Sequence, residues 1–338
     1  MKFGSPQKKF WRFAMEIERQ KIFGREDFDE QAINITFGVD SPFIPMMGIC
    51  MTSLIKNNPA RKISFHVFLD KIDWRDEEKI LELCRQSPTT QIILYFLPQD
   101  LYKEIPIIEK NYSRAIFYRI AAAQFLSTRL KRIIYMDADM LCLKPLDELL
   151  QMPLENFLLA AVVDTDVATR KRELGLSDNY KYFNSGFLYM NLEFWGREKI
   201  SEQVLKVLAE GKFFFPDQDA MNIVADRNAY KVRYIPNRFN NFFRVNSKEI
   251  PLTDDIVIEH FAGQKKPWHP WYNSPLTKLY ESYQKISPWH DFVYLPRNYQ
   301  EHRLMGRACL QQGKWLEALK WYFSYLKRRR IEKNSKRG

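Results

Sequence analysis

Cysteine is scarce in this sequence, and the few residues that occur are widely separated. The 338 residues include four, and no two of them form a C-x-x-C pair: Cys50, Cys84, Cys142 and Cys309. Disulfide frameworks and structural zinc sites need closely spaced cysteines. The sequence therefore predicts neither and fits a reducing compartment.

Two nucleotide-binding patterns and any long apolar run are also missing. Neither G-x-G-x-x-G nor G-x-x-x-x-G-K-[ST] occurs, which excludes a Rossmann dinucleotide turn and a P-loop. No stretch approaches the roughly 20 apolar residues that span a bilayer. The N-terminal segment mixes lysines and acids where a secretory leader has an unbroken apolar run. We therefore expect a cytoplasmic protein.

Positive charge is abundant but unevenly spread. The net charge is +11, and residues 314–338 hold nine Lys or Arg against two Glu, a net of +7 that leaves +4 for the other 313 residues. A basic tail can bind nucleic acid, but the sequence contains no recognised nucleic-acid-binding motif. The strand ends described below are also followed by aspartates, which would repel the phosphates of a nucleic acid. We expect no nucleic-acid partner.

Apolar runs alternate with helix-length segments over most of the chain. The expected strands are Ile33–Val39, Ile63–Leu69, Gln91–Leu97, Arg132–Met136, Phe157–Val163 and Phe187–Leu192. The expected helices between the first of them are Met46–Lys56, Arg75–Cys84 and Ser113–Leu126. This alternation predicts an α/β fold with a mostly parallel sheet covered by helices on both faces. In such sheets ligands bind beyond the carboxyl ends of the strands.

Aspartates follow several of these strands. They are Asp40, Asp70, Asp137, Asp139, Asp164 and Asp166. A single aspartate after a strand usually caps the next helix or forms a turn, but several on one edge are typical of a cation site. A divalent cation between carboxylates and a diphosphate would explain them.

The Asp-x-Asp pattern by itself does not select the metal ligands. It occurs four times, at Asp27–Asp29, Asp137–Asp139, Asp164–Asp166 and Asp217–Asp219. The second and third copies both follow apolar strands, so composition and spacing leave the choice between them open.

A longer series of segments occurs in fixed order along the chain. The segments are FGVDSPF, SFHVFLD, AIFYRI, IIYMDADML, AVVDTD, YFNSGFLYMNL, PDQDAMN and IEHFAGQKKPWH, which together cover roughly residues 33–271. In this order they resemble glycosyltransferase family 8, and more narrowly the bacterial α-hexosyltransferases of the lipopolysaccharide core. The resemblance implies a nucleotide-sugar domain of the GT-A type, Rossmann-like and mostly parallel, flanked by helices.

The same resemblance assigns a metal site and a donor site. Asp137, Asp139 and His260 would bind Mn²⁺ or Mg²⁺. The UDP-hexose donor would contact Gly38, Val39, Asp40, Arg119, Ala138, Asp164, Asn184, Gly263 and Lys266. Within this set, the first three would line the uracil and ribose pocket, and Lys266 would reach the diphosphate. One departure is Ser41-Pro42, where family members often have Asn or a charged residue.

The resemblance further implies retaining transfer of galactose or glucose to an outer-core oligosaccharide, with α-1,3 addition to a glucose as the expected linkage. Asp217 would contact sugar hydroxyls, Gln218 would lie nearest the anomeric carbon, and Asp219 is the alternative nucleophile. An amide is a poor nucleophile, so we favour a front-face route over a covalent intermediate of the kind retaining glycosidases use. Two alternatives stay open: transfer to another bacterial surface glycan, and a non-catalytic sugar-nucleotide-binding relative.

Three regions are expected along the chain: an N-terminal helical extension over residues 1–30, the catalytic domain over residues 31–272, and a basic helical region over residues 273–338. The last region is predicted to form two helices separated by a break near Gly313. The second helix has aromatic residues along one face. Such a helix can lie on an anionic membrane or pack on the catalytic domain. We favour the former, with the protein peripheral on the inner face of the inner membrane.

Overall fold

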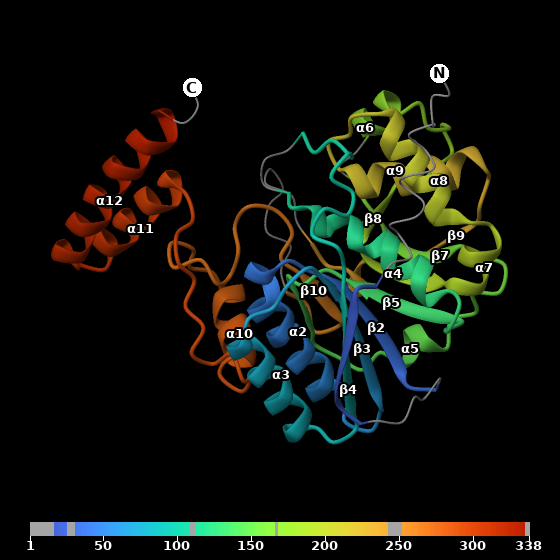
Figure 1. The fold of residues 1–338 in the computed structure, drawn as a ribbon, viewed down its shortest axis with the longest axis horizontal. Helices are drawn as coiled ribbons and strands as arrows, with labels where there is room; N and C mark the ends of the chain where they lie inside the picture. The colour runs from blue at the N-terminus through green and yellow to red at the C-terminus, as the bar shows by residue number, and fades with distance from the viewer. Residues whose placement is uncertain (1–16, 26–30, 109–111, 166–167, 243–251, 335–338) are drawn as a thin grey trace. The chain divides into compact units, whose positions relative to one another are not determined.

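The computed structural model describes residues 17–25, 31–108, 112–165, 168–242 and 252–334 (Figure 1). The chain divides into two compact units. The first, here called the sheet unit, comprises Met1–His260 and Ser287–Trp289, and the second, the helical unit, comprises Phe261–Ile286 and His290–Gly338.

A large sheet forms the centre of the sheet unit. In spatial order its strands are β1 (Arg19–Gly24), β4 (Thr90–Phe96), β3 (Ile63–Leu69), β2 (Ile33–Gly38), β5 (Arg132–Met136), β8 (Phe183–Asn191), β7 (Leu159–Val163) and β9 (Val232–Tyr234). The pairs β4–β3, β3–β2, β2–β5 and β7–β9 are parallel, whereas β1–β4, β5–β8 and β8–β7 are antiparallel. The predicted α/β fold with a mostly parallel sheet is confirmed.

Helices cover both faces of this sheet, so its central strands are buried throughout. They are α2 (Ile44–Asn57), α3 (Trp74–Gln86), α4 (Tyr118–Leu126), α5 (Asp147–Leu150), α6 (Ala168–Glu173), α7 (Leu192–Arg197), α8 (Ile200–Glu210) and α9 (Pro216–Arg227). Short 3₁₀ turns occur at η1 (Ser41–Phe43), η2 (Arg114–Phe117) and η4 (Asn237–Phe239). Figure 1 shows α2 and α3 on one side of the sheet and α4, α8 and α9 on the other.

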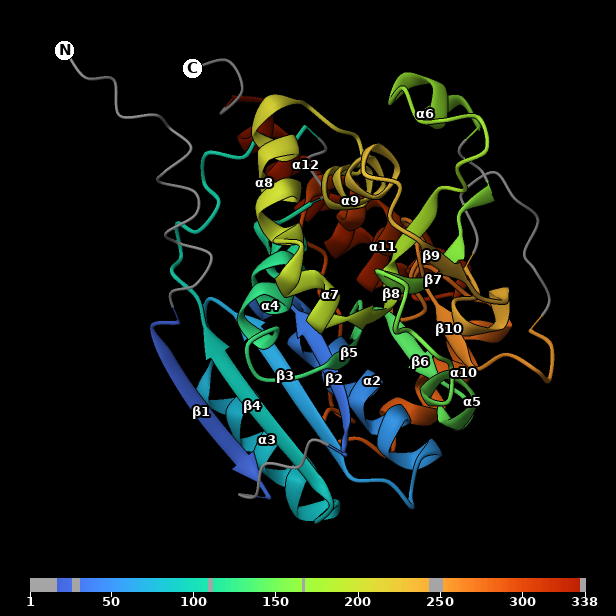
Figure 2. The same ribbon diagram turned by 90° about the vertical axis from the view of Figure 1, so that its right-hand side faces the viewer.

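A second, two-stranded sheet lies beside the first. It pairs β6 (Met140–Cys142) with β10 (Ile258–His260) in antiparallel register, and His260 stands opposite Met140. Figure 2 shows β6 and β10 side by side. This pairing joins two segments that lie more than a hundred residues apart in the sequence.

The six expected strands agree with observed ones to within two residues at either end, except at β8. That strand begins at Phe183 rather than Phe187, because its first residues, Asn184, Ser185 and Gly186, are polar or small and break the apolar pattern. They are nevertheless buried. Their polar groups are paired with side chains of α9, as described below, which removes the usual cost of burying them.

The prediction of a helical extension over residues 1–30 is wrong for residues 19–24. These residues form β1, an edge strand paired antiparallel with β4. Hydrogen bonds to β4 determine this conformation. Because β4 lies far along the chain, the pattern of residues 19–24 alone does not predict the pairing. Residues 1–16 and 26–30, which include Asp27–Asp29, lie outside the described residues.

The helical unit holds α10 (Pro275–Gln284), α11 (Tyr299–Gln311) and α12 (Trp315–Asn334). The last two form a hairpin, and the break between them falls at Gly313 as predicted, where φ is +73°. Glycine takes this left-handed conformation without steric cost. Among the residues that the structure describes, no helix is long and apolar enough to cross a membrane.

Candidate active site

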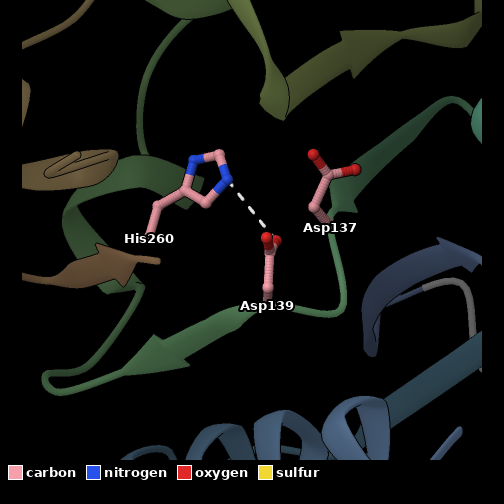
Figure 3. A group of neighbouring side chains, drawn as sticks. All are labelled: Asp137, Asp139 and His260. Carbon is pink, nitrogen blue, oxygen red and sulfur yellow. Dashed lines mark ion pairs between the residues drawn. The ribbon is translucent and has the colours of Figure 1, made fainter. Parts of the chain in front are cut away.

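Three potential metal ligands meet where β5 and β6 approach β10. Asp137 and Asp139 lie on the short turn between β5 and β6, and His260 is the last residue of β10. Each offers one ligand atom, and these atoms all lie within 4.8 Å of one another. Figure 3 shows the three side chains turned toward a common space. The β6–β10 register places His260 next to the Asp-x-Asp turn, because Met140 directly follows Asp139.

Hydrogen bonds fix the orientation of the His260 ring. Its Nδ1 lies 2.9 Å from Asn240 Oδ1, and Asn240 Nδ2 donates to Asn184 Oδ1 at 2.8 Å. Because the Asn240 amide must donate through its nitrogen, its oxygen accepts, and the network assigns the ring proton to Nδ1. The other nitrogen, Nε2, then faces Asp139 Oδ1 at 3.4 Å and offers a lone pair to a cation.

Asp137 is held by two donors on one of its oxygens. Arg119 donates to Oδ1 at 2.8 Å and Tyr135 Oη donates to the same oxygen at 2.9 Å. Burial raises the pKa of Asp137, the Arg119 guanidinium lowers it, and the neighbouring Asp139 carboxylate raises it. Two carboxylates this close together favour a bound cation, which relieves both the desolvation and the mutual repulsion.

Arg119 connects the Asp-x-Asp turn to α9. Its guanidinium also lies 3.1 Å from Asp217 Oδ2 and donates to the Ser185 carbonyl at 2.6 Å. Ser185 Oγ donates to Asp217 at 2.9 Å. The arginine is only 5% exposed, so its charge is balanced by Asp137 and Asp217 together rather than by water.

Because Gly186 of β8 has no side chain, there is room for the three candidate metal ligands to meet beside it. A Cβ atom at this position would lie 2.6 Å from His260 Cε1 and 2.8 Å from Asp137 Oδ2. Those distances are below van der Waals contact, so any side chain would displace a ligand. The glycine is required here by close approach.

Gln218, at the start of α9, is held at both ends of its amide. Its Oε1 accepts from Asn184 Nδ2 at 3.2 Å and from the Ser185 backbone N–H at 3.0 Å. Its Nε2 donates to Asp164 Oδ2 at 3.2 Å. Asn184 therefore links two sets of contacts, and a continuous chain of hydrogen bonds runs from His260 through Asn240, Asn184 and Gln218 to Asp164.

The Asp219 carboxylate forms hydrogen bonds that are separate from the chain linking His260 to Asp164. Its Oδ1 accepts from Tyr182 Oη at 2.6 Å and from Arg170 Nε at 3.1 Å. Its Oδ2 accepts from the Phe215 backbone N–H at 3.0 Å and from the other arm of Arg170. The side chain is fully buried, so its charge is satisfied by a bidentate arginine pair and two further donors.

The remaining expected donor residues of the sheet unit lie at the carboxyl end of β2 and on the Asp-x-Asp turn. Gly38 ends β2, and a Cβ there would lie 2.8 Å from Tyr118 Cβ. Val39 N–H donates to the Phe68 carbonyl at 3.0 Å, and the Asp40 carbonyl accepts from Phe43 N–H. Ala138, between the two metal-binding candidates, is buried.

Two expected donor contacts belong to the helical unit, and one aspartate is not described. Gly263 has φ of +87°, and Lys266 Nζ donates to the Phe261 carbonyl at 2.6 Å. Their roles stay predictions. Asp166, the second residue of the third Asp-x-Asp copy, lies outside the described residues.

Sequence reasoning missed four residues of the site: Tyr135, Ser185, Gly186 and Asn240. Three of them lie inside segments that the resemblance had already singled out, and only their roles were unassigned. Asn240 lies in none of those segments, and no local pattern distinguishes it from the neighbouring Asn241. Its contact with His260 arises only from the tertiary structure.

The hydrogen bond from His260 to Asn240 predicts a matched pair of variants. Asn240→Ala removes the acceptor that fixes the imidazole, and we expect Mn²⁺ affinity to fall by about 10–100-fold. Asn241→Ala is the control, because Asn241 Nδ2 donates to Glu259 rather than to His260. Mn²⁺ titration followed by electron paramagnetic resonance measures both. Equal affinities in folded Asn240→Ala and Asn241→Ala would contradict the assigned role.

Comparisons with known proteins identify the family to which the chain belongs. A family model described as "Glycosyl transferase family 8" matches residues 34–272. The chain is 28% identical over 319 residues to the lipopolysaccharide 1,3-galactosyltransferase of Salmonella typhimurium, covering 90% of this chain and 93% of that protein. It is 29% identical over 298 residues to a lipopolysaccharide 1,2-glucosyltransferase of Escherichia coli, covering 82% and 86%.

A solved structure shares the fold. Galactosyltransferase LgtC, bound to donor and acceptor sugar analogues, matches with a TM-score of 0.62 at 21% identity over 79% of this chain and 99% of that chain. This likeness confirms the expected GT-A-type architecture and, at such identity, concerns the fold alone. Since the family model covers more than half of the sequence, the chain belongs to glycosyltransferase family 8.

Proposed function

We propose that this chain transfers a hexose from UDP-hexose to the lipopolysaccharide core with retention of the α configuration. The observation that carries the proposal is the meeting of Asp137, Asp139 and His260 beside Gln218 and Asp164, on a chain of this family. The relatives named above act on lipopolysaccharide by their printed names. Since one is a galactosyltransferase and the other a glucosyltransferase, both hexoses remain candidates.

The alternative of a non-catalytic relative is disfavoured by the completeness of the site. A protein that only binds a sugar nucleotide needs no oriented imidazole beside two carboxylates. Here the ring is oriented by Asn240 and the carboxylate of Asp137 by Arg119 and Tyr135. Transfer to a different bacterial surface glycan would use the same donor site. The two reactions differ only in the acceptor, so an acceptor screen distinguishes them.

We propose Mn²⁺ or Mg²⁺ as the metal. Two carboxylates suit both ions, and the imidazole favours Mn²⁺ somewhat. When bound, the ion would stabilise negative charge on the diphosphate as UDP leaves. The protein's own part is to hold Asp137, Asp139 and His260 in place before the donor arrives.

The donor would extend along the edge of the sheet. Gly38, Val39 and Asp40 would line the uracil and ribose pocket at the end of β2, and Ala138 would lie beside the metal. The hexose would contact Arg119, Asp164 and Asn184. The family resemblance assigns Gly263 and Lys266 to the diphosphate. Burial of Asp164 and Asn184 supports this role, because a sugar hydroxyl needs donors and acceptors that are already oriented.

The contacts of Asp219 support a front-face route. A nucleophilic carboxylate must present a free oxygen to the anomeric carbon, but both oxygens of Asp219 are occupied by Arg170, Tyr182 and the Phe215 amide. In the proposed route the bond from the anomeric carbon to the UDP oxygen breaks. The acceptor hydroxyl oxygen bonds to the same face, and its proton passes to the departing β-phosphate oxygen. Gln218 would lie nearest the anomeric carbon, and Asp217 would contact sugar hydroxyls.

We further propose that the acceptor is reached at the inner face of the inner membrane. Helix α12 exposes an apolar stripe at Trp315, Leu316, Leu319, Phe323 and Leu326. Basic residues follow it along the same helix. Such a helix binds an anionic surface through its apolar face and its charge together. The expected linkage is α-1,3 to a glucose of the outer core.

Metal dependence is the first test of the proposed reaction. On truncated lipopolysaccharide with Mn²⁺ or Mg²⁺, we expect release of UDP from UDP-galactose or UDP-glucose, and loss of that release when the metal is chelated. Asp139→Ala should lower the rate by at least about a hundredfold, because a ligand to the charge-stabilising ion is gone. Asp100→Ala, an exposed acid paired with Lys103, is the control. Full activity of Asp139→Ala would refute the assigned metal site.

The front-face route predicts that no covalent adduct forms on Asp219. Intact-protein mass spectrometry of the native enzyme with a slowly reacting 2-fluoro donor should show unmodified protein while turnover continues. The physical reason is that Asp219 must lose its hydrogen bonds to Arg170 and Tyr182 before it can attack. Trapping a hexosyl-Asp219 species would establish double displacement instead.

Membrane association is tested by vesicle flotation with a matched control. Trp315→Ser with Phe323→Ser removes two side chains that are 67% and 70% exposed, and we expect reduced flotation with vesicles containing phosphatidylserine. Trp74→Ser removes a tryptophan that is 63% exposed in the sheet unit and should leave flotation unchanged. Equal flotation of all variants would count against a membrane role for α12.

A further inference from the structure

A basic groove lies between the two helices of the C-terminal hairpin. It encloses about 490 Å³, and its lining consists of Tyr299, Gln300, Arg303, Leu304, Arg307, Tyr325 and Arg329. Every one of these residues belongs to α11 or α12 within the helical unit. None of them was assigned a role by the sequence or by the proposed transfer reaction.

Helical spacing brings the basic residues to the groove from both sides. Tyr299, Arg303 and Arg307 follow one another at intervals of four on α11, and Tyr325 and Arg329 do the same on α12. Residues four apart share a face of a helix. The rings of Tyr299 and Tyr325 lie 6.2 Å apart between their centroids, so the two faces meet along the groove.

The hairpin is packed closely enough to hold this arrangement. A Cβ atom at Gly306 would lie 3.2 Å from the Tyr322 ring, so the glycine lets α12 approach α11. The rings of His302 and Trp321 lie 5.3 Å apart between their centroids. The groove is therefore set by side-chain packing between the helices rather than by the loop that joins them.

The charge of the groove is unbalanced. Its lining includes three arginines and no acid, and in the part of the chain that the structure describes neither Arg303 nor Arg307 forms an ion pair. A carboxylate does come near, since Glu332 accepts from the Tyr299 backbone N–H at 3.2 Å, but it does not line the groove. Two like charges four residues apart destabilise a helix. A bound anion would relieve that repulsion.

The ordinary explanation for exposed arginines is a solvated helix surface. Solvation alone does not bring arginines from two helices to one hollow with two tyrosines beside them. Arg329 lies over the Tyr325 ring, 5.9 Å from its centroid, which limits the freedom of its guanidinium. Planar guanidinium groups bind phosphate oxygens in pairs, and tyrosine hydroxyls add donors. This chemistry fits a phosphomonoester, whose charge approaches −2 at neutral pH.

The neighbouring surface indicates where such a phosphate comes from. Leu326, on the exposed apolar stripe of α12, precedes Arg329 by three residues, so the two side chains are neighbours on the helix. A lipid headgroup could enter the groove while its apolar part contacts the stripe, and a small soluble phosphate could not use both surfaces. We propose that the groove between α11 and α12 binds the phosphomonoester headgroup of a membrane lipid. The assignment of the phosphate to a membrane lipid rests on the proposed function, whereas the preference of the groove for a phosphomonoester does not.

Vesicle binding at matched surface charge tests this proposal. Vesicles of phosphatidic acid, a monoester, and of phosphatidylserine, a diester, are prepared at equal zeta potential. We expect the full-length chain to bind the former roughly tenfold more tightly, as an additional charged hydrogen bond allows. Arg303→Gln with Arg307→Gln should abolish that preference. Lys320→Gln with Lys327→Gln removes the same charge outside the groove and should weaken binding to both vesicles equally.

A conservative variant separates phosphate recognition from net charge. Arg303→Lys with Arg307→Lys keeps the charge but removes the paired donors, so we expect phosphatidylserine binding to persist and the preference for phosphatidic acid to fall. Far-UV circular dichroism reports whether each variant keeps its helices. Equal binding of the wild type to both vesicles, or a preference that survives both arginine variants, would overturn the proposal.

Soluble probes distinguish the two possible sources. If millimolar inorganic phosphate displaces the chain from phosphatidic acid vesicles completely, the groove takes a free phosphate and the lipid source is wrong. If the wild type binds neither vesicle, the membrane association of the proposed function fails. The groove is then judged by calorimetry with short-chain phosphatidic acid below its critical micelle concentration. Binding that is lost in Arg303→Gln with Arg307→Gln supports the groove, and absence of binding refutes it.

Discussion

The antiparallel pairing of β6 with β10 is the constraint on which the metal site depends. The turn after β5 carries two carboxylates, and alone these form an acidic turn that water and small ions can satisfy. The register that sets His260 opposite Met140 adds a third potential ligand from a distant part of the chain. Strand pairing fixes positions to within a fraction of the side-chain spacing, because a slip of one residue turns the side chain to the other face. The geometry of the site therefore follows from backbone hydrogen bonds.

Buried polar groups then orient the ligands that the strands have placed. His260, Asn240, Asn184, Gln218 and Asp164 form one chain of hydrogen bonds in which each amide has its donor and acceptor ends determined by its neighbours. A buried polar network is stable only if its members are satisfied together. A change at one amide is therefore expected to affect both the metal ligand and the glutamine proposed to face the sugar. The polar start of β8 is buried in the sheet for this reason.

The candidate binding sites of the two units gather charge of opposite sign. The site of the sheet unit gathers carboxylates, and its arginines, the buried Arg119 and the half-buried Arg170, are paired with aspartates. The groove of the helical hairpin is lined by three arginines and, among the residues that the structure describes, by no acid. The first arrangement suits a cation and a diphosphate held by it, whereas the second suits a phosphate directly. A glycosyltransferase whose proposed acceptor is a membrane lipid has a use for both.

The sequence by itself determined six strands of the large sheet, their order in the chain and the break between the last two helices, because apolar periodicity and glycine conformation are local properties. Two strands, Ile63–Leu69 and Arg132–Met136, were located to the residue. Together with the resemblance, it singled out Asp137, Asp139 and His260 as the candidate metal ligands among the four Asp-x-Asp copies. Tertiary structure decided what no local pattern encodes: that residues 19–24 are an edge strand, that the side chain of Asn240 rather than that of Asn241 orients the His260 imidazole, and that Asp219 is bound by Arg170. Each of these depends on a contact with a residue distant in the chain, and such contacts form only when packing brings the elements together.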